Sequence, residues 1–434
     1  MLKLITPLSF ILMTAMPACA HAPASESAVK TSAPSVQQTV KLAQLSPQPK
    51  TIAPTKMSQK QRYSAWKDDF TTRAIAKGHD PALVASVISS AKMNPKAIAR
   101  NKTQPEFSKP IWSYVDGAAS AIRVNSGKAK LRTHTTLFDD IETRFHVDRN
   151  VLTAVWGLET AYGKILGNHD IIDSLSTFAF EGRRKAFGES QLFAILDMLR
   201  DNVIRIDQLT GSWAGAMGMT QFIPTTFRDY AVDYRADGNK DLWTDPADAL
   251  GSAANYLSRF GWRIEEPIFT EVILPKGFAY ELADGTKRTI SGWSGMGVRP
   301  VSGQTWSNPA MFLEAKLLIP AGANGPVFLT FKNFDVIKKY NNSTSYALGI
   351  GVLAKSYQGE TAIVRDWPRT DKPLSHTDKK NLQRALTNQG FDTKGVDGQL
   401  GPNSRRAIRA WQTANKVPAD GYVEQSLLKN ILGK

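Results

Sequence analysis

The sequence predicts a mainly helical protein of the α+β class, with a small β subdomain inserted into a helical body and a three-helix module at the C-terminal end. Apolar residues recur at helical spacing through most of the chain after residue 57. Between residues 264 and 332 the pattern changes to short strand-like runs at residues 269–274, 314–319 and 327–331, separated by Gly and Pro. Residues 374–434 supply a small apolar set of their own, which indicates a separate module.

Composition sets the scale of the protein and suggests the kind of partner. A chain of 434 residues is long enough for several domains, and its 42% apolar content is ordinary for a protein that buries real cores. Lys and Arg outnumber Asp and Glu by 54 to 39, a formal charge of +15. This charge favours an anionic partner such as nucleic acid, anionic lipid or an acidic cell-wall polymer. Because no nucleic-acid-binding motif is recognisable, we expect no nucleic-acid partner.

The N-terminal residues have the pattern of a secretory signal. Residues 2–16 form a short apolar run with Lys3 near its start, too short to span a membrane as a helix. We therefore expect a signal peptide over residues 1–20 and an exported, periplasmic protein. Residues 21–57 are rich in Ala, Pro, Ser, Thr, Gln and Val without an aromatic side chain, and they predict a disordered tether.

Cys19 is the only cysteine, which excludes an internal disulfide or a metal site built from cysteines. Two hypotheses for signal processing compete. Residues 18–20 (ACA) fit the small-x-small site of a signal peptidase, whereas residues 16–19 (MPAC) resemble a bacterial lipobox. We favour lipidation of Cys19, because an otherwise cysteine-free exported protein has no evident use for it. Lipid at this position would anchor the protein at the outer membrane.

Residues 58–134 predict a helical domain. A first helix starts near Tyr63, and a second opens at Asp80-Pro81, with Asp80 as N-cap and Pro81 in the first turn. A later helix carries Trp112 and Tyr114. Aromatic residues at this spacing are more often core residues than ligand contacts, and Tyr114 is the one that we single out as a candidate contact.

Residues 135–263 hold the densest functional signals, beginning with the predicted helix VLTAVWGLETAYG at residues 151–163. On a helix, Leu152 and Trp156 share or border the face of Glu159. A lone carboxylate on an apolar face is costly to ionise, so we expect a raised pKa and a proton to donate. From this stretch alone, the simpler interpretation is a Glu159 that reaches out to solvent at the helix end.

A glycine-rich segment, GSWAGAMGMTQFIP at residues 211–224, follows a helix predicted over residues 190–200. Its three glycines would let the backbone approach a ligand closely, and Gln221 offers a donor and an acceptor to a sugar amide or hydroxyl. The alternative is a tight helix crossing that needs small residues. The segment alone does not decide between the two.

Residues 233–244 (DYRADGNKDLWT) partly fit a calcium-binding loop. The candidate ligands are Asp233, Asp237, Asn239 and Asp248. Arg235 stands where a ligand is needed and cannot bind a cation, and Thr244 stands in the place of the final Glu. A solvated Asp-Gly turn that caps the following helix is the safer interpretation.

The chain returns to helix over residues 333–365, where Tyr340, Asn341 and Tyr346 place polar and aromatic groups suited to a binding wall. A Pro-bearing linker at residues 366–373 leads to the module at residues 374–434. A module this small has little room for a catalytic pocket, so we expect it to bind a ligand.

The chain resembles the membrane-bound lytic murein transglycosylase B family in ETAYG, SWAGAMGMTQFIPTTF, DGNKDLW, PADALGSAANYLSRFGW and YNNSTSYALGIG. The tail, LQRALTNQGFDTKGVDGQLGPNSRRAIRAWQ, is similar to the short peptidoglycan-binding module often attached to such enzymes. The resemblance implies that residues 58–365 are the catalytic region. Within it, residues 135–263 and 333–365 would form a lysozyme-like core, with the helical domain before it and the β subdomain inserted.

The resemblance also implies cleavage of the β-1,4 bond between N-acetylmuramic acid and N-acetylglucosamine, without a required cofactor. The single catalytic acid of the family matches Glu159, which would protonate the leaving oxygen and then deprotonate the muramic 6-hydroxyl. That hydroxyl closes a 1,6-anhydro ring. The implied groove residues are Ser212, Gln221, Tyr340, Asn341 and Tyr346 near the cleaved bond, and Arg183, Arg184, Tyr114 and Tyr256 further along.

Ordinary glycosidases use two carboxylates, ~5–5.5 Å apart for retention or ~6.5–9.5 Å for inversion. Around Glu159 the candidates for a second acid are Asp173, Glu181 and Glu189, and each fits a helix end or cap about as well. A one-acid enzyme works when the substrate supplies the nucleophile. A hydrolysing muramidase and a non-catalytic peptidoglycan-binding scaffold are the alternatives. We expect a monomer whose partner is the glycan strand, with at most a structural calcium ion.

Overall fold

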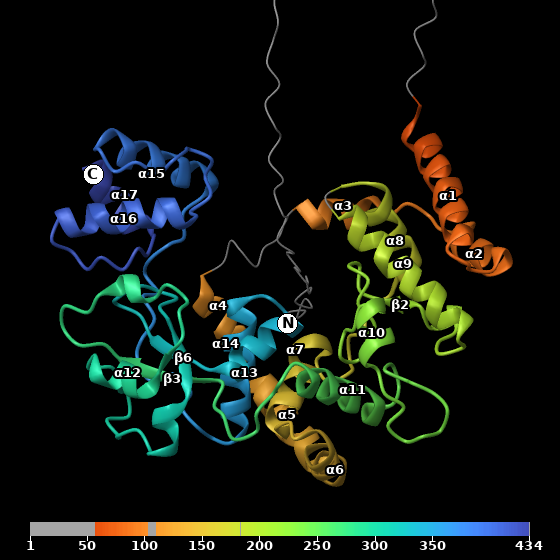
Figure 1. The fold of residues 1–434 in the computed structure, drawn as a ribbon, viewed down its shortest axis with the longest axis horizontal. Coiled ribbons are helices and arrows are strands. Elements are labelled where there is room, and N and C mark those ends of the chain that lie inside the picture. The colour runs from red at the N-terminus through yellow and green to blue at the C-terminus, as the bar shows by residue number, and fades with distance from the viewer. Residues whose placement is uncertain (1–56, 103–109, 183, 434) are drawn as a thin grey trace, which may run out of the picture.

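The computed structural model describes residues 57–102, 110–182 and 184–433, which form a helical body, a small sheet and a C-terminal helical module (Figure 1). The expectations for the signal peptide, for nearly all of the tether, for Cys19 and for Arg183 concern residues outside this part of the chain. Of the helices in the described part, none is both long and apolar enough to cross a bilayer.

The secondary-structure elements fall into three groups: the helices before the five-stranded sheet, the strands, and the remaining helices. The helices before the sheet are α1 (Gln59–Ala76), α2 (Pro81–Ile88), α3 (Pro95–Lys102), α4 (Ile111–Ala118), α5 (Ala121–Thr133), α6 (Thr135–Phe145), α7 (Arg149–Thr160), α8 (Ile171–Phe180), α9 (Lys185–Arg200), α10 (Pro224–Tyr230) and α11 (Pro246–Arg259). The strands are β1 (His169–Asp170), β2 (Thr210–Gly211), β3 (Phe269–Ile273), β4 (Arg288–Thr289), β5 (Arg299–Pro300), β6 (Glu314–Leu318) and β7 (Val327–Thr330). The remaining helices are α12 (Ile290–Gly295), α13 (Lys332–Tyr340), α14 (Thr344–Tyr357), α15 (His376–Asn388), α16 (Pro402–Ala414) and α17 (Gln425–Leu432), and short 3₁₀ turns lie at Ile206–Gln208, Tyr280–Leu282 and Pro309–Phe312.

Five antiparallel strands form the inserted sheet, in the order β4-β6-β7-β3-β5. In its centre β3 pairs with β7, which places Phe269 opposite Thr330 and Val272 opposite Val327. The apolar runs in the sequence predicted β3, β6 and β7. They did not predict β4 and β5, because strands of only two residues contain no alternating pattern. The predicted fold class, mainly helical with a small sheet, is confirmed.

The helices of the body share one continuous apolar core, in which α14 packs against α4 and α7, and α8 packs against α9. Asp80 caps α2 as predicted, accepting the Leu83 N–H at 2.9 Å. Helix α9 begins at Lys185, ahead of the predicted Ser190. Gly188 lies in this early part of α9 and lets it approach α8 closely, because a Cβ added there would lie 2.4 Å from the backbone nitrogen of Ala179. Close packing between the helices thus outweighs the low helix propensity of glycine.

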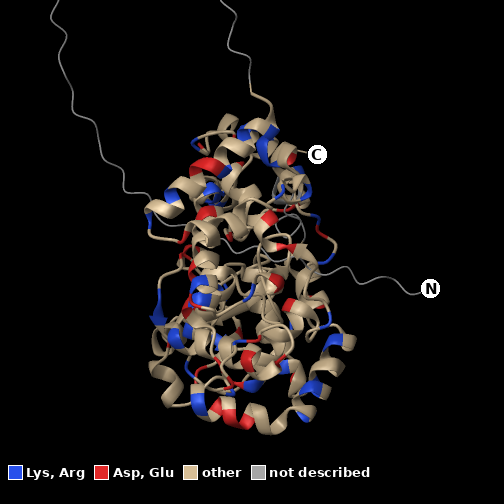
Figure 2. Ribbon diagram, turned by 90° about the vertical axis from the view of Figure 1, so that its right-hand side faces the viewer, with Lys and Arg blue, Asp and Glu red and all other residues tan. Residues whose placement is uncertain are grey.

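The C-terminal module has a core of its own, formed by α15, α16 and α17 around Leu382, Leu386, Ile408, Trp411, Leu427 and Ile431. In Figure 1 the module lies above the sheet, on the opposite side of the molecule from α1 and α2. Figure 2 shows Lys and Arg interspersed with Asp and Glu over the ribbon, so the net positive charge is not gathered into one continuous basic face in that view.

Candidate active site

Glu159 lies one residue before the end of α7, in the most buried stretch of the helical body. All ten residues from Val151 to Thr160 are buried, and the side chain of Glu159 is only 5% exposed. The interpretation of a solvent-facing helix end is therefore wrong for this residue. Burial removes much of the hydration that would stabilise a carboxylate at this position.

The end of α7 is held by a sharp turn and two hydrogen bonds that fix where Glu159 points. The backbone turns through left-handed conformations at Ala161, Tyr162 and Gly163 (φ 50°, 63° and 82°), which stops the helix at once. The Tyr162 hydroxyl donates to the carbonyl of Arg123 at 2.6 Å, and the Thr160 hydroxyl donates to the carbonyl of Met219 at 2.6 Å. Residues in left-handed conformations cost free energy, so these anchors hold a strained turn directly behind the acid.

A pocket opens over Glu159. Its lining in the described part of the chain is Glu159, Arg184, Phe187, Ala214, Ala216, Gln221, Ile223 and Tyr340. The structure thus brings Glu159 together with Arg184, Gln221 and Tyr340, three of the predicted groove residues. Glu159 is the one carboxylic acid among the described lining residues. Phe187, Ala214, Ala216 and Ile223 were not predicted.

Two tyrosines complete the immediate surroundings of the acid. Tyr346, in the first turn of α14, is fully buried, and its hydroxyl donates to Oε1 of Glu159 at 2.8 Å. Tyr340, the last residue of α13, donates to the carbonyl of Thr220 at 2.5 Å. Desolvation, followed by the charge of Glu159, raises the pKa of both hydroxyls well above the ordinary value. Both phenols therefore stay protonated, and Tyr346 stays a donor toward the acid.

The other predicted groove residues lie near this pocket without lining it. The Ser212 hydroxyl accepts the N–H of Ala216 at 3.0 Å and so stabilises the turn beside the pocket. Asn341 is 3% exposed and accepts the Ser343 N–H at 3.1 Å in the connection between α13 and α14. Tyr114, on α4, packs closely against α14, the helix that carries Tyr346.

A larger hollow of about 500 Å³ continues from the pocket, with Phe187 and Ile223 in the lining of both. Its wall contains Tyr230, Tyr256 and Phe260. Tyr256 therefore lies further along the same groove from Glu159. Apolar rings beside polar groups suit the mixed surface of a sugar chain.

The glycines of residues 211–224 serve the packing of the protein in this structure. Gly215 (φ 90°) lies against Leu175, where an added Cβ would come within 2.6 Å of the side chain. Gly218 (φ 69°) lies against Leu242, 2.7 Å from an added Cβ. These contacts support close packing of small residues, but not the tight helix crossing expected from the sequence, because residues 212–223 form turns rather than a helix. Gln221 itself has a left-handed backbone (φ 52°), and its amide donates to the carbonyl of Gly218 at 3.0 Å.

The predicted candidates for a second carboxylate do not line the pocket of Glu159. They are bound elsewhere: Asp173 to the Lys92 N–H at 2.7 Å, Glu181 to the Gln59 side-chain amide at 2.6 Å, and Glu189 to Arg73 at 2.7 Å. Among the described residues, the lining of the Glu159 pocket therefore lacks the second acid of a conventional glycosidase.

The aspartates of the predicted calcium loop bind backbone N–H groups. Asp233 accepts the N–H of Gly238 at 2.8 Å. One oxygen of Asp248 accepts the N–H of Tyr234 at 2.7 Å, and its other oxygen accepts the N–H of Asp241 at 2.6 Å. Throughout the part of the chain that the structure describes, no three acidic, His or Cys side chains are grouped to hold a metal ion. The candidate ligands, as placed, do not fit a calcium site.

In that loop Arg235 pairs with Asp245 at 2.7 Å. The guanidinium thus brings a positive charge to the side of the loop where a calcium loop would need a ligand. Asp237 is engaged as well, since it accepts the N–H of Asn239 at 2.9 Å.

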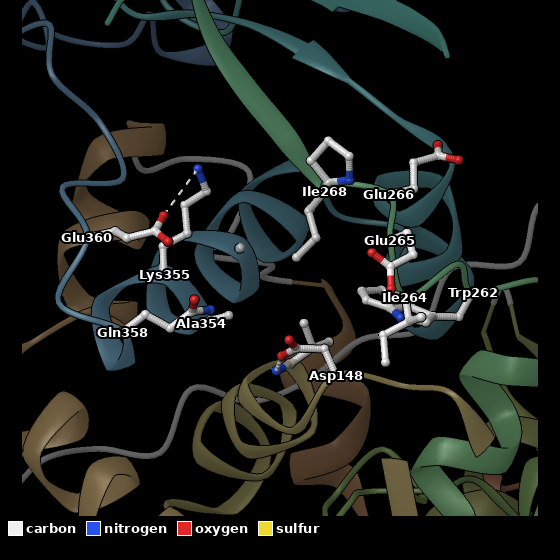
Figure 3. A pocket seen from close by; sticks show the side chains of 13 residues that line it. Asp148, Trp262, Ile264, Glu265, Glu266, Ile268, Ala354, Lys355, Gln358 and Glu360 are labelled. Atoms are coloured by element: carbon white, nitrogen blue, oxygen red, sulfur yellow. Dashed lines mark hydrogen bonds and ion pairs between the residues drawn. The ribbon is translucent and has the colours of Figure 1, made fainter. Parts of the chain in front are cut away.

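A separate pocket of about 280 Å³ lies at the other end of α7 (Figure 3). Its acidic side chains are largely engaged. Asp148 caps α7 through the Asn150 N–H at 2.7 Å, and Glu360 lies 3.8 Å from Lys355. This pocket contains none of the predicted site residues, and the groove at Glu159 is the better candidate for chemistry.

The unpredicted lining residues carried a weak signal in the sequence. Ala214, Ala216 and Ile223 belong to the glycine-rich segment, so their neighbourhood was identified but not their exposure to the pocket. Phe187 stands three residues after Arg184 on the first turn of α9, and nothing in its local pattern separates it from a core phenylalanine.

Two family models match the chain. One, described as "Transglycosylase SLT domain", matches residues 62–355, and the other, "Putative peptidoglycan binding domain", matches residues 375–431. A curated relative, Membrane-bound lytic murein transglycosylase B of Escherichia coli (strain K12), is 34% identical over 216 residues, which are 49% of this chain and 57% of that protein. The chain thus spans little more than half the length of this relative.

Solved structures are also similar. SltB3 from Pseudomonas aeruginosa, in complex with NAG-anhNAM-pentapeptide, is 42% identical with a TM-score of 0.80, over 85% of this chain and 99% of that chain. The lytic transglycosylase Slt35 of Escherichia coli, in complex with calcium, is 28% identical with a TM-score of 0.59, over 67% of this chain and 92% of that chain. These similarities agree with the lysozyme-like fold expected from the sequence.

Proposed function

Because the chain belongs to the transglycosylase SLT domain family, we propose that it is a lytic transglycosylase that cleaves the β-1,4 bond between N-acetylmuramic acid and N-acetylglucosamine in peptidoglycan. The observation that carries the proposal is that Glu159 is the one carboxylic acid among the described residues of its pocket. It is buried, it accepts a hydrogen bond from Tyr346, and it shares its pocket with no other described carboxylic acid. Such a site suits a reaction in which the substrate supplies its own nucleophile.

In the first step, protonated Glu159 donates its proton to the bridging oxygen, and the bond between that oxygen and the muramic anomeric carbon breaks. N-acetylglucosamine leaves as an alcohol. The carbonyl oxygen of the muramic N-acetyl group traps the positive charge at the anomeric carbon. Proton transfer leaves a carboxylate beside the developing cation. Burial favours this step because the attraction between these two charges is stronger where water is excluded.

In the second step, the Glu159 carboxylate accepts the proton of the muramic 6-hydroxyl, and that oxygen attacks the anomeric carbon. The 1,6-anhydro ring closes, the N-acetyl oxygen is released, and Glu159 is protonated again. No water is consumed. The Tyr346 hydroxyl supports the carboxylate between the two steps, and it stabilises the charged form more than the neutral one.

The other residues of the groove would hold the glycan in position for this intramolecular attack. Arg184, Gln221 and Tyr340 border the acid, and Tyr256 lies in the hollow beyond it. Ser212 and Asn341 act by stabilising the turns on which these groups stand. Tyr114 would support α14 through its contact beside Gly349, and Arg183 adds a second basic group before α9 in the sequence.

We extend the proposal to the whole chain. Residues 58–365 would cleave the glycan and residues 374–434 would bind the wall, in agreement with the two family matches. Signal-like residues 1–20 and the lipobox-like Cys19 favour export and a lipid anchor on the periplasmic side of the outer membrane. We propose that the protein acts there as a monomer. The reaction as written needs no cofactor. Any calcium would be structural, and Arg235 would weaken its binding to the loop.

The test is digestion of purified peptidoglycan followed by mass spectrometry. We expect soluble muropeptides with 1,6-anhydro ends from the unaltered protein and none from Glu159→Gln, which keeps the shape of the side chain but cannot donate the proton. Glu181→Gln is the matched control, since Glu181 was a candidate second acid and binds Gln59 outside the pocket. It should cleave like the parent.

Other outcomes would identify the alternatives. Products ~18 Da heavier, with a free reducing end, would show that water is the nucleophile and favour a hydrolysing muramidase. Binding to sacculi with no released muropeptide would favour a scaffold. Activity retained in Glu159→Gln would remove this residue from its proposed role.

A further inference from the structure

The C-terminal module contains one hydrogen-bonded arrangement twice. In the first copy, Gln383 on α15 donates its amide to Oδ1 of Asp397 at 3.0 Å and accepts the N–H of Gly398 at 2.7 Å. We call these three residues the first clasp. Gln383 is 1% exposed, so the loop that carries Asp397 and Gly398 is fixed to the core of the module.

The second clasp repeats this pattern one helix later. Gln412 on α16 donates its amide to Oδ1 of Asp420 at 2.8 Å and accepts the N–H of Gly421 at 2.9 Å. Both glycines have left-handed backbones, with φ 75° at Gly398 and 69° at Gly421. In each clasp the internal hydrogen bonds use Oδ1 of the aspartate, which leaves Oδ2 for another donor.

The second clasp has a partner within the same chain. The backbone N–H of Ala323 donates to Oδ2 of Asp420 at 2.7 Å. Gly322 lies so close that an added Cβ would come within 2.7 Å of this oxygen and 2.8 Å of the Cβ of Tyr422. The clasp therefore takes up a backbone N–H from a segment of small residues, at the contact between the module and the inserted sheet.

The first clasp presents the same group to solvent. Asp397 is exposed, and its Oδ1 also accepts the N–H of Gln399 at 2.8 Å. Among the described residues no hydrogen bond reaches its Oδ2. The hydrogen bond from Gln383, followed by that from Gln399, lowers the pKa of Asp397, so the carboxylate stays charged. Val396, next to it, is 37% exposed and offers an apolar contact.

We propose that the first clasp binds the peptide stems of peptidoglycan, with a backbone N–H beside an alanine donating to Oδ2 of Asp397 as Ala323 donates to Asp420. The inference rests on the proposed function, in which the wall is the partner of the protein. A peptide fits better than a sugar because the occupant of the second clasp is a peptide backbone flanked by small residues. Val396 would contact the alanine methyl group.

The experiment measures binding of the full chain to intact sacculi by sedimentation, and to free stem pentapeptide by calorimetry. Asp397→Asn is the informative variant. It keeps an Oδ1 acceptor for Gln383 and replaces the outward oxygen with an amide that repels an N–H donor. We expect the affinity for both ligands to fall at least ~10-fold, as for the loss of one charge-assisted hydrogen bond, with an unchanged unfolding temperature.

The matched control is Asp392→Asn, which removes the same charge from the same module at an exposed residue paired with Lys394. It should bind like the parent. Unchanged binding by Asp397→Asn, equal losses in both variants, or full binding to glycan strands stripped of peptide would each overturn the inference. Failure of the parent to release anhydro products, with binding still sensitive to Asp397, would instead count against the proposed function alone.

Discussion

Tyr346 provides the sharpest test of how the site works, because its hydroxyl and Glu159 are joined by one hydrogen bond of 2.8 Å in a fully buried place. The substitution Tyr346→Phe removes this hydroxyl and keeps the ring that packs in the core. The carboxylate form of Glu159 loses a charge-assisted donor, whereas the protonated acid loses a weaker bond. The variant should therefore hold the catalytic proton more tightly.

The size of the effect follows from the type of bond. A hydrogen bond contributes about 1.5–3 kcal/mol to a charged group and about 0.5–1.5 kcal/mol to a neutral one, so the difference of about 1–1.5 kcal/mol corresponds to a shift of about one pH unit. A general acid works only while it is protonated. The alkaline limb of the kcat/KM profile should accordingly move upward by that amount in Tyr346→Phe.

The assay is the rate of release of anhydro muropeptides from sacculi across the pH range. Tyr63→Phe is the control, because the Tyr63 hydroxyl also makes a buried hydrogen bond of 2.8 Å, to Ser176, away from the acid. Its profile should keep the parental limbs. Identical alkaline limbs in Tyr346→Phe and the parent, in a variant that folds normally, would refute the reasoning.

Two further predictions concern the loop and the module. Arg235→Asn frees Asp245 from its ion pair. Calcium, compared with EDTA, should therefore raise the unfolding temperature of the variant and leave that of the parent unchanged. Stabilisation of the parent by calcium would contradict this prediction. Burial, then the neighbouring Asp371, raises the pKa of Glu424 to about 8 from 4.5. The folded protein thus holds a proton that the unfolded chain releases, and stability should fall as pH rises from 4.5 to about 8. Glu424→Gln should flatten this slope in thermal melts, and an unchanged slope would exclude Glu424 as its source.

Local pattern was enough to locate the elements that carry the site. The helix predicted over residues 151–163, which the structure has at Arg149–Thr160, and the glycine-rich segment were identified from spacing and residue type alone, and the Asp80 cap formed as predicted. The apolar runs located β3, β6 and β7 for the same reason, since side chains of a half-buried strand alternate along the sequence. The resemblance of the motifs then named the family that the comparisons support.

Other features depended on contacts between distant parts of the chain. The sequence left open whether the glycines near Gly215 serve a ligand or the packing, and only the neighbouring Leu175 decided for packing. The aspartates of residues 233–244 have the spacing of a calcium loop. Their oxygens nevertheless accept backbone N–H groups, and Arg235 forms an ion pair with Asp245. Neither the packing of these glycines nor the ion pair of Arg235 can be predicted from a local sequence pattern.

The sequence by itself determined which residue types were available: a lone glutamate on an apolar helix, and a basic chain with a signal-like first segment and a small C-terminal module. Tertiary structure decided that this glutamate is buried, that Tyr346 donates to it from 187 positions away, and that no described second acid shares its pocket. The reason is physical. Periodicity reports how a segment meets water on average, whereas proton transfer depends on which few atoms lie within hydrogen-bonding distance once distant segments have packed together.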